Sequence, residues 1–402
     1  MPLHAFLIIA LLIATFSLLC SAFIVFSQDW HGKVSHDHNL DGVQKFHAAA
    51  VPRVGGIAIV AGMGLGLAAT LLFQPGLLSH ADMADLGRVL LLLAASGPAF
   101  AAGIIEDLVK TVSIKMRLAA TLLSPLLASL LLGATVRHLN LWGIDSLLTL
   151  APIAVAVTAL AVAGGANAIN IIDGFHGLSA GVILVMAVAL GALGLQHQDS
   201  LVVFLAAMVI SATAGFSIFN YPAGKLFLGD GGAYFLGFWV AEMAVLLLVR
   251  HADISAWQIL AICAYPVIEV LFSIFRRKYL NGQAPGQADA LHLHTLVYRR
   301  IVLKRLVSSA SRQGRGNALV SLLIVPPVAL LAALAVWVGQ SSPVSMALVA
   351  AATVAYVALY MALVRRPHLR AVAARQRPMR RRTDVAPAPV VEQDAVRQLL
   401  RG

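Results

Sequence analysis

The chain has 402 residues, of which 60% are hydrophobic and 12% are charged, and its formal net charge is +11. Soluble globular domains carry nearer a quarter charged residues, so this composition excludes an ordinary soluble domain. Apolar runs of about 18 residues or more recur along the chain, a pattern typical of a polytopic helical membrane protein. The Lys and Arg residues cluster between these runs, which indicates loops facing anionic lipid and argues against a nucleic-acid partner.

An all-α fold with about eleven transmembrane helices is predicted from the apolar runs. The predicted helices cover residues 3–27, 52–73, 88–105, 116–132, 147–163, 178–195, 201–219, 234–249, 257–275, 317–339 and 345–364. Eleven spans place the two ends of the chain on opposite sides of a membrane. All but three of the 29 Lys and Arg residues then fall on one side, so the positive-inside rule predicts a periplasmic N-terminus and a cytoplasmic C-terminus.

Residues 1–364 are predicted to form one integral membrane domain, because no long polar segment interrupts them. Residues 365–402 are rich in Arg and then in Pro and Ala, which predicts a disordered cytoplasmic tail with weak attraction to anionic lipid. Cys20 and Cys263 both lie inside apolar runs. For these cysteines we expect plain packing rather than a disulfide or a metal site.

The stretch between two of the apolar runs, residues 164–177, is unusually polar. Asn167, Asn170, Asp173 and His176 recur at every third position, with a pair of glycines before them and two more glycines near their end. Polar groups so close to hydrocarbon are costly unless they bind or react. The glycines predict broken helix ends, which are natural sites for anions and metal ions. An ordinary cytoplasmic turn with a polar cap is the alternative.

A carboxylate set among glycines is the best candidate for a metal ligand. Asp230 lies in the sequence Gly-Asp-Gly-Gly, where the backbone can approach a ligand closely. Mg²⁺ prefers hard oxygen ligands and binds through one or two protein oxygens together with substrate phosphates. Asp230 with the amide oxygen of Asn170 meets this requirement, although an ordinary glycine turn has the same sequence.

Four further carboxylates lie at or inside apolar runs. Glu106 and Asp107 end one run, where two negative charges oppose the helix macrodipole. This placement indicates a metal, proton transfer, basic partners or, alternatively, a solvated loop edge. The basic partners are expected among Lys110, Lys115 and Arg117. Glu242 and Glu269 lie inside other runs, where we expect each to pair with a base or to face the polar site.

Several basic groups are placed to bind an anion. Arg53 precedes a glycine pair at a predicted helix start and is suited to a phosphate, although a close-packed glycine pair beside a positive flank is equally consistent. His292 and His294 lie in the longest loop, where zinc would need more ligands than the loop offers, so phosphate contact is preferred. The basic, amphipathic pattern over residues 296–307 predicts a helix on the membrane surface that is suited to a lipid phosphate.

Residues 167–174, 228–231 and 292–294 read Asn-Ala-Ile-Asn-Ile-Ile-Asp-Gly, Leu-Gly-Asp-Gly and His-Leu-His. These motifs resemble the signatures of the polyprenyl-phosphate N-acetylhexosamine-1-phosphate transferases, bacterial glycosyltransferase family 4. Residues 52–56 and the acidic pair after Gly103 match as well, in the same order over about residues 1–340. The resemblance implies a multi-pass protein of the bacterial inner membrane with its active site at the cytoplasmic face. It also implies transfer of N-acetylhexosamine 1-phosphate from a UDP-sugar to polyprenyl (undecaprenyl) phosphate, with release of UMP and the start of a cell-envelope glycan.

The resemblance assigns roles to the residues at matching positions. Asn170 and Asp230 would hold Mg²⁺, with Mn²⁺ as an alternative ion. Asp107, beside Glu106, would orient or deprotonate the lipid phosphate, and Asp173 would lie at the uridine or diphosphate of the donor. The implied substrate-binding residues are Lys45, His47, Arg53, Asn167, His176, His292 and His294. The implied partners are a UDP-N-acetylhexosamine, polyprenyl phosphate and membrane lipid, and a homodimer stays open.

Two departures from the family pattern and two alternatives accompany this interpretation. Glu106 replaces the usual Asp and keeps its charge, whereas His176 stands where the family often has Asp and removes a charge. Direct attack by the lipid phosphate needs no protein nucleophile, but a covalent route through Asp107 is the competing mechanism. A transporter of an anionic or lipid-linked substrate is the alternative function, although the sequence has no internal repeat and its motifs gather at one surface.

Overall fold

The computed structural model describes residues 3–36, 50–73, 80–141, 143–280, 289, 291–306 and 313–364. Lys45 and His47 lie outside the described residues, as does the predicted tail. The chain divides into two compact units, Met1–Tyr360 and Met361–Gly402, and the predicted domain boundary after residue 364 stays a prediction. Within the described ranges the regular structure is helical, apart from an isolated bridge between His36 and Pro52.

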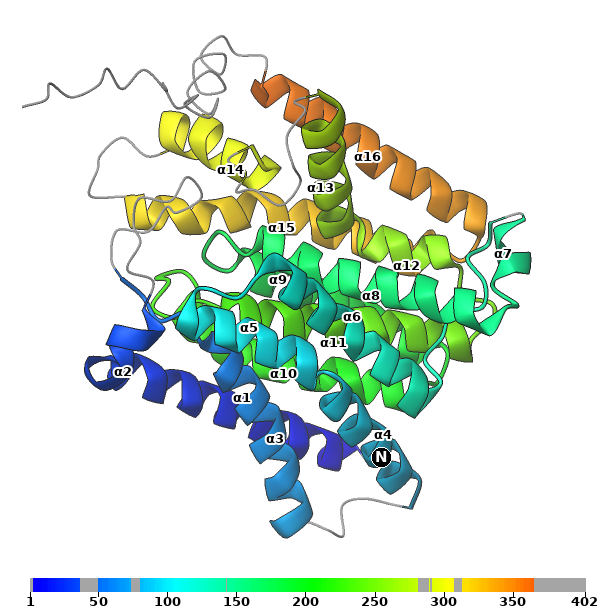
Figure 1. Ribbon diagram of the computed structural model, residues 1–402, viewed down its shortest axis with the longest axis horizontal. Coiled ribbons are helices and arrows are strands. Elements are labelled where there is room, and N and C mark those ends of the chain that lie inside the picture. The colour runs from blue at the N-terminus through cyan, green and yellow to red at the C-terminus, as the bar shows by residue number, and fades with distance from the viewer. Residues whose placement is uncertain are drawn as a thin grey trace, which may run out of the picture. The chain divides into compact units, whose positions relative to one another are not determined.

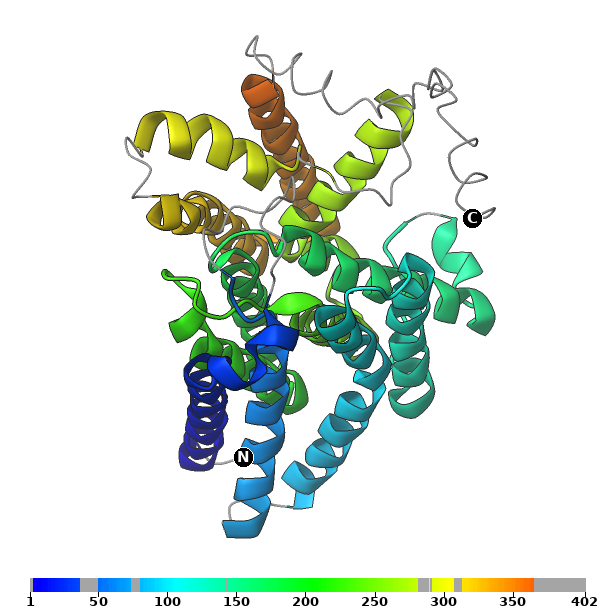
Figure 2. The ribbon, with the colours of Figure 1, turned by 60° about the vertical axis from the view of Figure 1, so that its left-hand side comes forward.

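The first unit is a bundle built around one buried helix. The described helices are α1 (Leu3–Phe26), α2 (Gln28–Ser35), α3 (Gly55–Phe73), α4 (His80–Ala95), α5 (Gly97–Val109), α6 (Ile114–Leu132), α7 (Ile144–Leu147), α8 (Ala151–Ile172), α9 (Leu178–Gln196), α10 (Ser200–Asn220), α11 (Gly229–Arg250), α12 (Ala256–Ile262), α13 (Ala264–Phe275), η2 (Arg276–Leu280), α14 (Leu293–Val297), η3 (Tyr298–Leu306), α15 (Gln313–Val338) and α16 (Ser342–Val364). In an 18-residue apolar window of helix α11, 89% is buried, and the helix packs against α3, α5, α8, α9 and α10 (Figures 1 and 2). The helices that pack against α11 are thereby positioned relative to the two ends of α11.

The number of membrane-spanning helices agrees with the prediction. Among the described residues, nine helices are long and apolar enough to cross a membrane, and two bent helix pairs raise the count to as many as eleven. The pair α4–α5 bends by 42° and the pair α12–α13 by 86°. At the first bend Pro98, near the start of α5, has no backbone N–H to continue the preceding helix. The predicted orientation of the chain ends stays a prediction.

Two of the helix boundaries that differ from the sequence prediction lie near the polar residues. The expected break at Gly164–Gly165 is wrong, because α8 continues to Ile172. A glycine inside a helix costs only about 1 kcal/mol, and here it allows α8 to approach α11: a Cβ on Gly165 would lie 3.3 Å from the Cβ of Ala241. Similarly, α11 begins at Gly229 rather than at residue 234, so Asp230 lies in the first turn of a helix and not in a loop.

Glycines bring three helix ends into backbone contact beside Asp230. A Cβ on Gly103 of α5 would lie 2.5 Å from the Cα of Gly231, and a Cβ on Gly56 of α3 would lie 2.3 Å from the backbone N of Gly232. The chain before α3 is also hydrogen-bonded to the chain before α11, since the N–H of Phe227 donates to the carbonyl of Pro52 at 2.9 Å. The start of α11 is therefore fixed by both α3 and α5.

Replacing Gly103 with Ala tests this close packing. The added methyl group has no room against the backbone of Gly231, so α5 and α11 must move apart, and overpacking of this kind costs about 1–3 kcal/mol. We expect Gly103→Ala to lower the melting temperature of the full chain in detergent. Gly64→Ala on α3 is the control, because its Cβ would meet nothing within 4 Å. Equal melting of the two variants would contradict the proposed role of Gly103.

Candidate active site

A polar cavity of about 350 Å³ lies where several helix ends meet. The cavity is lined by Arg53, Glu106, Arg117, Asn170, Ile171, Asp173, Gly174, Phe175, His176, Asn220, Phe227, Asp230, His292, His294, Thr295 and Asn317. These residues belong to segments that are far apart in the sequence, including the last turns of α5 and α8 and the first turns of α6 and α11. The fold therefore gathers most of the described site residues that the sequence indicated.

Asp230 is the centre of the hydrogen bonding in the cavity. Its Oδ1 accepts from Nη2 of Arg53 at 3.1 Å and from Nδ2 of Asn170 at 3.0 Å. Its Oδ2 accepts from Nη1 of Arg117 at 3.0 Å. The Asp230 side chain is only 9% exposed, so these charge-assisted hydrogen bonds replace the water that a carboxylate would otherwise need. Arg117 is an expected partner of Glu106 and Asp107, but its ion pair is with Asp230, whereas Nη2 of Arg53 lies 3.8 Å from Oδ1 of Asp107.

Asp107 does not line the cavity, but its carboxylate fixes the backbone at Asp230 through hydrogen bonds. Its Oδ1 accepts the backbone N–H of Asp230 and its Oδ2 accepts the backbone N–H of Gly231, both at 2.9 Å. The side chain is fully buried and is not part of the cavity wall. The Asp107 carboxylate thus interacts unfavourably with the dipole of its own helix, α5, as expected. It interacts favourably with the positive N-terminal end of α11. Its predicted contact with a lipid phosphate stays a prediction.

Two other carboxylates differ in their surroundings. Glu106 lines the cavity, and its Oε2 accepts the backbone N–H of Val112 at 2.8 Å. Asp173 follows the end of α8 and accepts a short hydrogen bond from the hydroxyl of Ser179. Burial raises the pKa of Asp173 to about 6, although the Ser179 hydroxyl and the charge of Arg53 act in the opposite direction. Asp173 therefore titrates closer to neutral pH than an ordinary aspartate does.

The two histidines of the His-Leu-His motif share one buried carboxylate. Their rings stack with centroids 5.2 Å apart, because His292 has an extended backbone and only His294 lies within α14. Oε1 of Glu269 lies 2.9 Å from Nδ1 of His292, and Oε2 lies 3.9 Å from Nδ1 of His294. The expectation that Glu269 pairs with a base is confirmed. Burial lowers the pKa of His294 to about 4, so its ring is neutral at pH 7 and offers hydrogen bonds without charge.

The remaining predicted residues divide between the cavity and the packing around it. His176 lines the cavity, its backbone N–H donates to Oδ1 of Asn317 at 2.7 Å, and its Nδ1 lies 3.1 Å from the carbonyl of Pro222. Asn167 does not line the cavity. Its Nδ2 donates to Oγ1 of Thr121 at 3.1 Å and so ties α8 to α6.

Sequence reasoning missed several polar residues of this region. They are Ser179, Asn220, Thr295 and Asn317. Asn220 is buried, its Oδ1 accepts the backbone N–H of Gly177 at 2.8 Å and its Nδ2 donates to the carbonyl of Leu226 at 2.8 Å. Each of these residues is a small polar side chain at a helix end, which in the sequence looks the same as an ordinary cap.

The donor chemistry of the cavity fits Mg²⁺. The carboxylates of Asp230, Asp173 and Glu106 and the amide of Asn170 are hard oxygen donors of the kind that this ion prefers. In the present arrangement two guanidinium groups and an amide N–H occupy the oxygens of Asp230. Coordination by Asp230 and Asn170 therefore requires the guanidiniums to move to another anion and the Asn170 amide to turn its oxygen inward.

The fold and the cavity define a helical membrane protein with an acidic and basic site at one end of its bundle. Residues 89–248, less than half of the chain, match the profile of glycosyl transferase family 4. The chain is 28% identical over 257 residues to the probable undecaprenyl-phosphate N-acetylglucosaminyl 1-phosphate transferase of Bacillus subtilis (strain 168), covering 62% of this chain and 66% of the relative. It is 31% identical over 134 residues to the phospho-N-acetylmuramoyl-pentapeptide-transferase of Lactococcus lactis subsp. cremoris (strain MG1363), covering 33% of this chain and 39% of the relative. The undecaprenyl-phosphate alpha-N-acetylglucosaminyl 1-phosphate transferase of Yersinia pestis is 28% identical over 268 residues, 64% of this chain and 68% of the relative.

Substitution of Asp107 tests its support of α11. Ala leaves two buried backbone N–H groups without an acceptor, at a cost of about 1–3 kcal/mol, whereas Asn keeps one acceptor oxygen. We expect the melting temperature to fall in the order wild type, Asp107→Asn, Asp107→Ala. Asp29→Ala, at an exposed carboxylate in the first turn of α2, is the control. Melting temperatures that do not separate Asp107→Ala from Asp29→Ala would rule out this support.

Proposed function

We propose that the protein transfers N-acetylhexosamine 1-phosphate from a UDP-sugar to polyprenyl phosphate and releases UMP. The observation that carries the proposal is the Asp230 cluster, in which one carboxylate is held by Arg53, Arg117 and Asn170. Such a cluster can exchange protein ion pairs for contacts to a metal and to phosphates. The match of residues 89–248 to glycosyl transferase family 4, and the activities that the names of the relatives state, support this reaction.

The charges of the cavity suit two anionic substrates. Arg53 and Arg117 can leave Asp230 and bind phosphate oxygens, a pairing for which the guanidinium fork is well shaped. Mg²⁺ held by Asp230 and Asn170 would neutralise charge on the donor diphosphate. The neutral ring of His294, with His292 beside it, would supply hydrogen bonds to the same diphosphate.

The proposed chemical step needs little proton transfer. An oxygen of the polyprenyl phosphate forms a bond to the sugar-bearing phosphorus, and the bond between that phosphorus and the bridging oxygen of UMP breaks. The attacking phosphate is already largely ionised at pH 7, so a strong base is not required. The residues of the cavity then contribute mainly by positioning the two substrates and by stabilising charge. Asp107 would act through the position of Asp230 rather than as a nucleophile.

The position of the cavity favours a transferase over the alternative transporter. Its residues Glu106, Arg117, Asn170 and Asp230 lie in the first or last turns of α5, α6, α8 and α11, whereas transporters place their sites near the middle of the bilayer. A site at a helix end is open to a nucleotide sugar from water and to a phosphate at the lipid surface. With the predicted orientation, this end faces the cytoplasm of a bacterial inner membrane, where the reaction would start an envelope glycan.

The comparisons favour UDP-N-acetylglucosamine as the donor to test first. The matches to two N-acetylglucosaminyl 1-phosphate transferases cover 62% and 64% of this chain, whereas the match to the pentapeptide transferase covers 33%. UDP-N-acetylmuramoyl-pentapeptide is the matched competing donor.

A lipid-dependent assay of UMP release tests the reaction. We expect the purified protein with Mg²⁺ to release UMP from UDP-N-acetylglucosamine only when polyprenyl phosphate is present, and to place the labelled sugar in the lipid extract. A stoichiometric burst of UMP without lipid, abolished by Asp107→Asn, would instead support the covalent route. Failure of both donors to label lipid would overturn the proposed function.

Substitution of Asp230 tests the metal site. Asp230→Asn removes the charge that pairs with both guanidiniums and with a divalent ion, so we expect turnover to fall at least about 100-fold, the scale of one lost electrostatic contact in a transition state. Asp145→Asn is the control, since Oδ1 of Asp145 accepts from the backbone N–H of Leu139 in a turn remote from the cavity lining. Turnover of Asp230→Asn within twofold of wild type at every Mg²⁺ concentration would exclude Asp230 as the ligand.

A further inference from the structure

A second cluster of titratable residues lies at the other end of α11. His197 follows α9, and His251 and Asp253 follow α11 in the turn that leads to α12. Helix α11 has 22 residues from Gly229 to Arg250, a length of about 33 Å at 1.5 Å per residue. The cluster is therefore separated from Asp230 by about the thickness of a bilayer core, and the proposed reaction does not use it.

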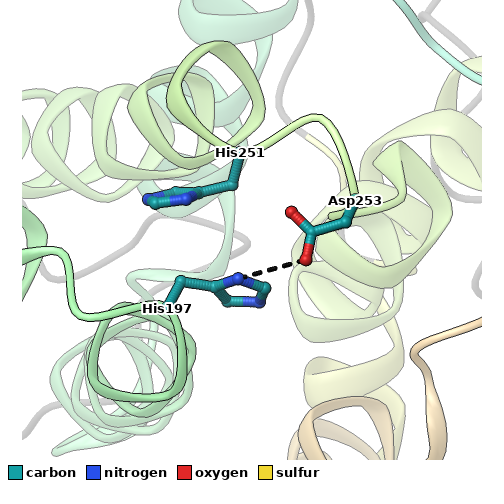
Figure 3. A group of neighbouring side chains, drawn as sticks. All are labelled: His197, His251 and Asp253. Carbon is teal, nitrogen blue, oxygen red and sulfur yellow. Dashed lines mark ion pairs between the residues drawn. The ribbon is translucent and has the colours of Figure 1, made fainter.

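The three side chains are close enough to share one ion (Figure 3). Nδ1 of His197 lies 3.3 Å from Oδ2 of Asp253, and the ring centroids of His197 and His251 are 5.0 Å apart. One ligand atom from each of the three residues can be chosen so that all lie within 4.8 Å of one another. Ligands around a tetrahedral ion with bonds near 2.0–2.1 Å are about 3.3 Å apart, so small side-chain movements complete the geometry.

A buried carboxylate already orients one of the histidines. Oδ2 of Asp199 lies 2.9 Å from Nε2 of His251, which places the ring proton on Nε2 and leaves the Nδ1 lone pair for a ligand bond. Histidines that bind metals generally donate their second N–H to a carboxylate in this way. Asp199 is itself fixed, because it accepts from Nε of Arg250 at 2.6 Å and from the backbone N–H of Val202 at 3.2 Å. Its side chain is fully buried.

The ligand set determines the class of ion. Two imidazoles and one carboxylate suit Zn²⁺ and similar transition metals, whereas Mg²⁺ and Ca²⁺ prefer oxygen ligands alone. Three protein ligands leave a fourth position for water. The side chain of Asp253 is 71% exposed, so an ion can enter from solvent.

We propose that His197, His251 and Asp253 bind a zinc-class divalent ion at the end of the bundle remote from the Asp230 cavity. The ion would join the turn between α9 and α10 to the turn between α11 and α12. It would thereby restrain the far end of the helix whose first turn carries Asp230. This proposal does not depend on the transfer reaction.

The test is Zn²⁺ binding to the full chain in detergent, purified with a tag that contains no histidine and measured by calorimetry in excess Mg²⁺. We expect one Zn²⁺ per chain that is lost or weakened more than about tenfold, the scale of a perturbed ligand shell, in Asp253→Asn and in His197→Ala. Zn²⁺ should also raise the melting temperature of the wild type and not that of these variants. His4→Ala, at an exposed histidine in the first turn of α1, is the control and should bind as the wild type does.

Because Asp253 is exposed, Asp253→Asn is not expected to disturb folding. Loss of Zn²⁺ binding in this variant can therefore be assigned to the lost ligand. Zn²⁺ binding that persists unchanged in Asp253→Asn and His197→Ala but disappears in His294→Ala would place the ion in the other cavity and overturn the proposal. Absence of Zn²⁺ binding by the wild type would show that the cluster is an ion-pair network only, which also overturns it.

Discussion

The position of Asp230 in the cavity depends on two hydrogen bonds accepted by Asp107, whose side chain does not line the cavity. Asp107 extends from the last turn of α5 and accepts the first backbone N–H groups of α11 with both carboxylate oxygens. A carboxylate at the C-terminal end of its own helix is unfavourable, and the positive end of a second helix compensates for it. This pairing requires the two backbones to touch, which the glycines at positions 103 and 231 allow. The position of Asp230, and with it the reach of Arg53 and Arg117, follows from that contact.

Charge balance is the second constraint on this region. Asp230 is matched by two guanidiniums, and Oε1 of the Glu269 carboxylate lies 2.9 Å from Nδ1 of His292. Asp289 accepts from Ser273 and Arg276, and although burial alone would raise the pKa of Asp289, the neighbouring His292 and Arg276 outweigh it and lower the value. A buried charge without its partner is strongly destabilising. The cavity is therefore organised before substrates arrive, and binding exchanges one set of ion pairs for another.

Hydropathy was sufficient to predict most helices, because a membrane span needs about 20 apolar residues whatever it packs against. It could not predict the bends between α4 and α5 or between α12 and α13, since a break inside an apolar run leaves the hydropathy unchanged. The motifs placed Asn170 and Asp230 in one site, and the structure brings them together. Asn167 belongs to the same motif but packs against α6, because the rotation of α8 is set by tertiary contacts. The pairing of Arg117 with Asp230 likewise depends on where α6 lies.

The separations along the chain within the Asp230 cluster bear on how the protein is made. Asp230 bonds to residues that precede it by 177, 113 and 60 positions. During synthesis the two guanidiniums emerge well before the carboxylate that joins them. The cluster is therefore completed only when the first turn of α11 has been added to the helices that precede it. Contacts of such high sequence separation close long loops, which slows folding.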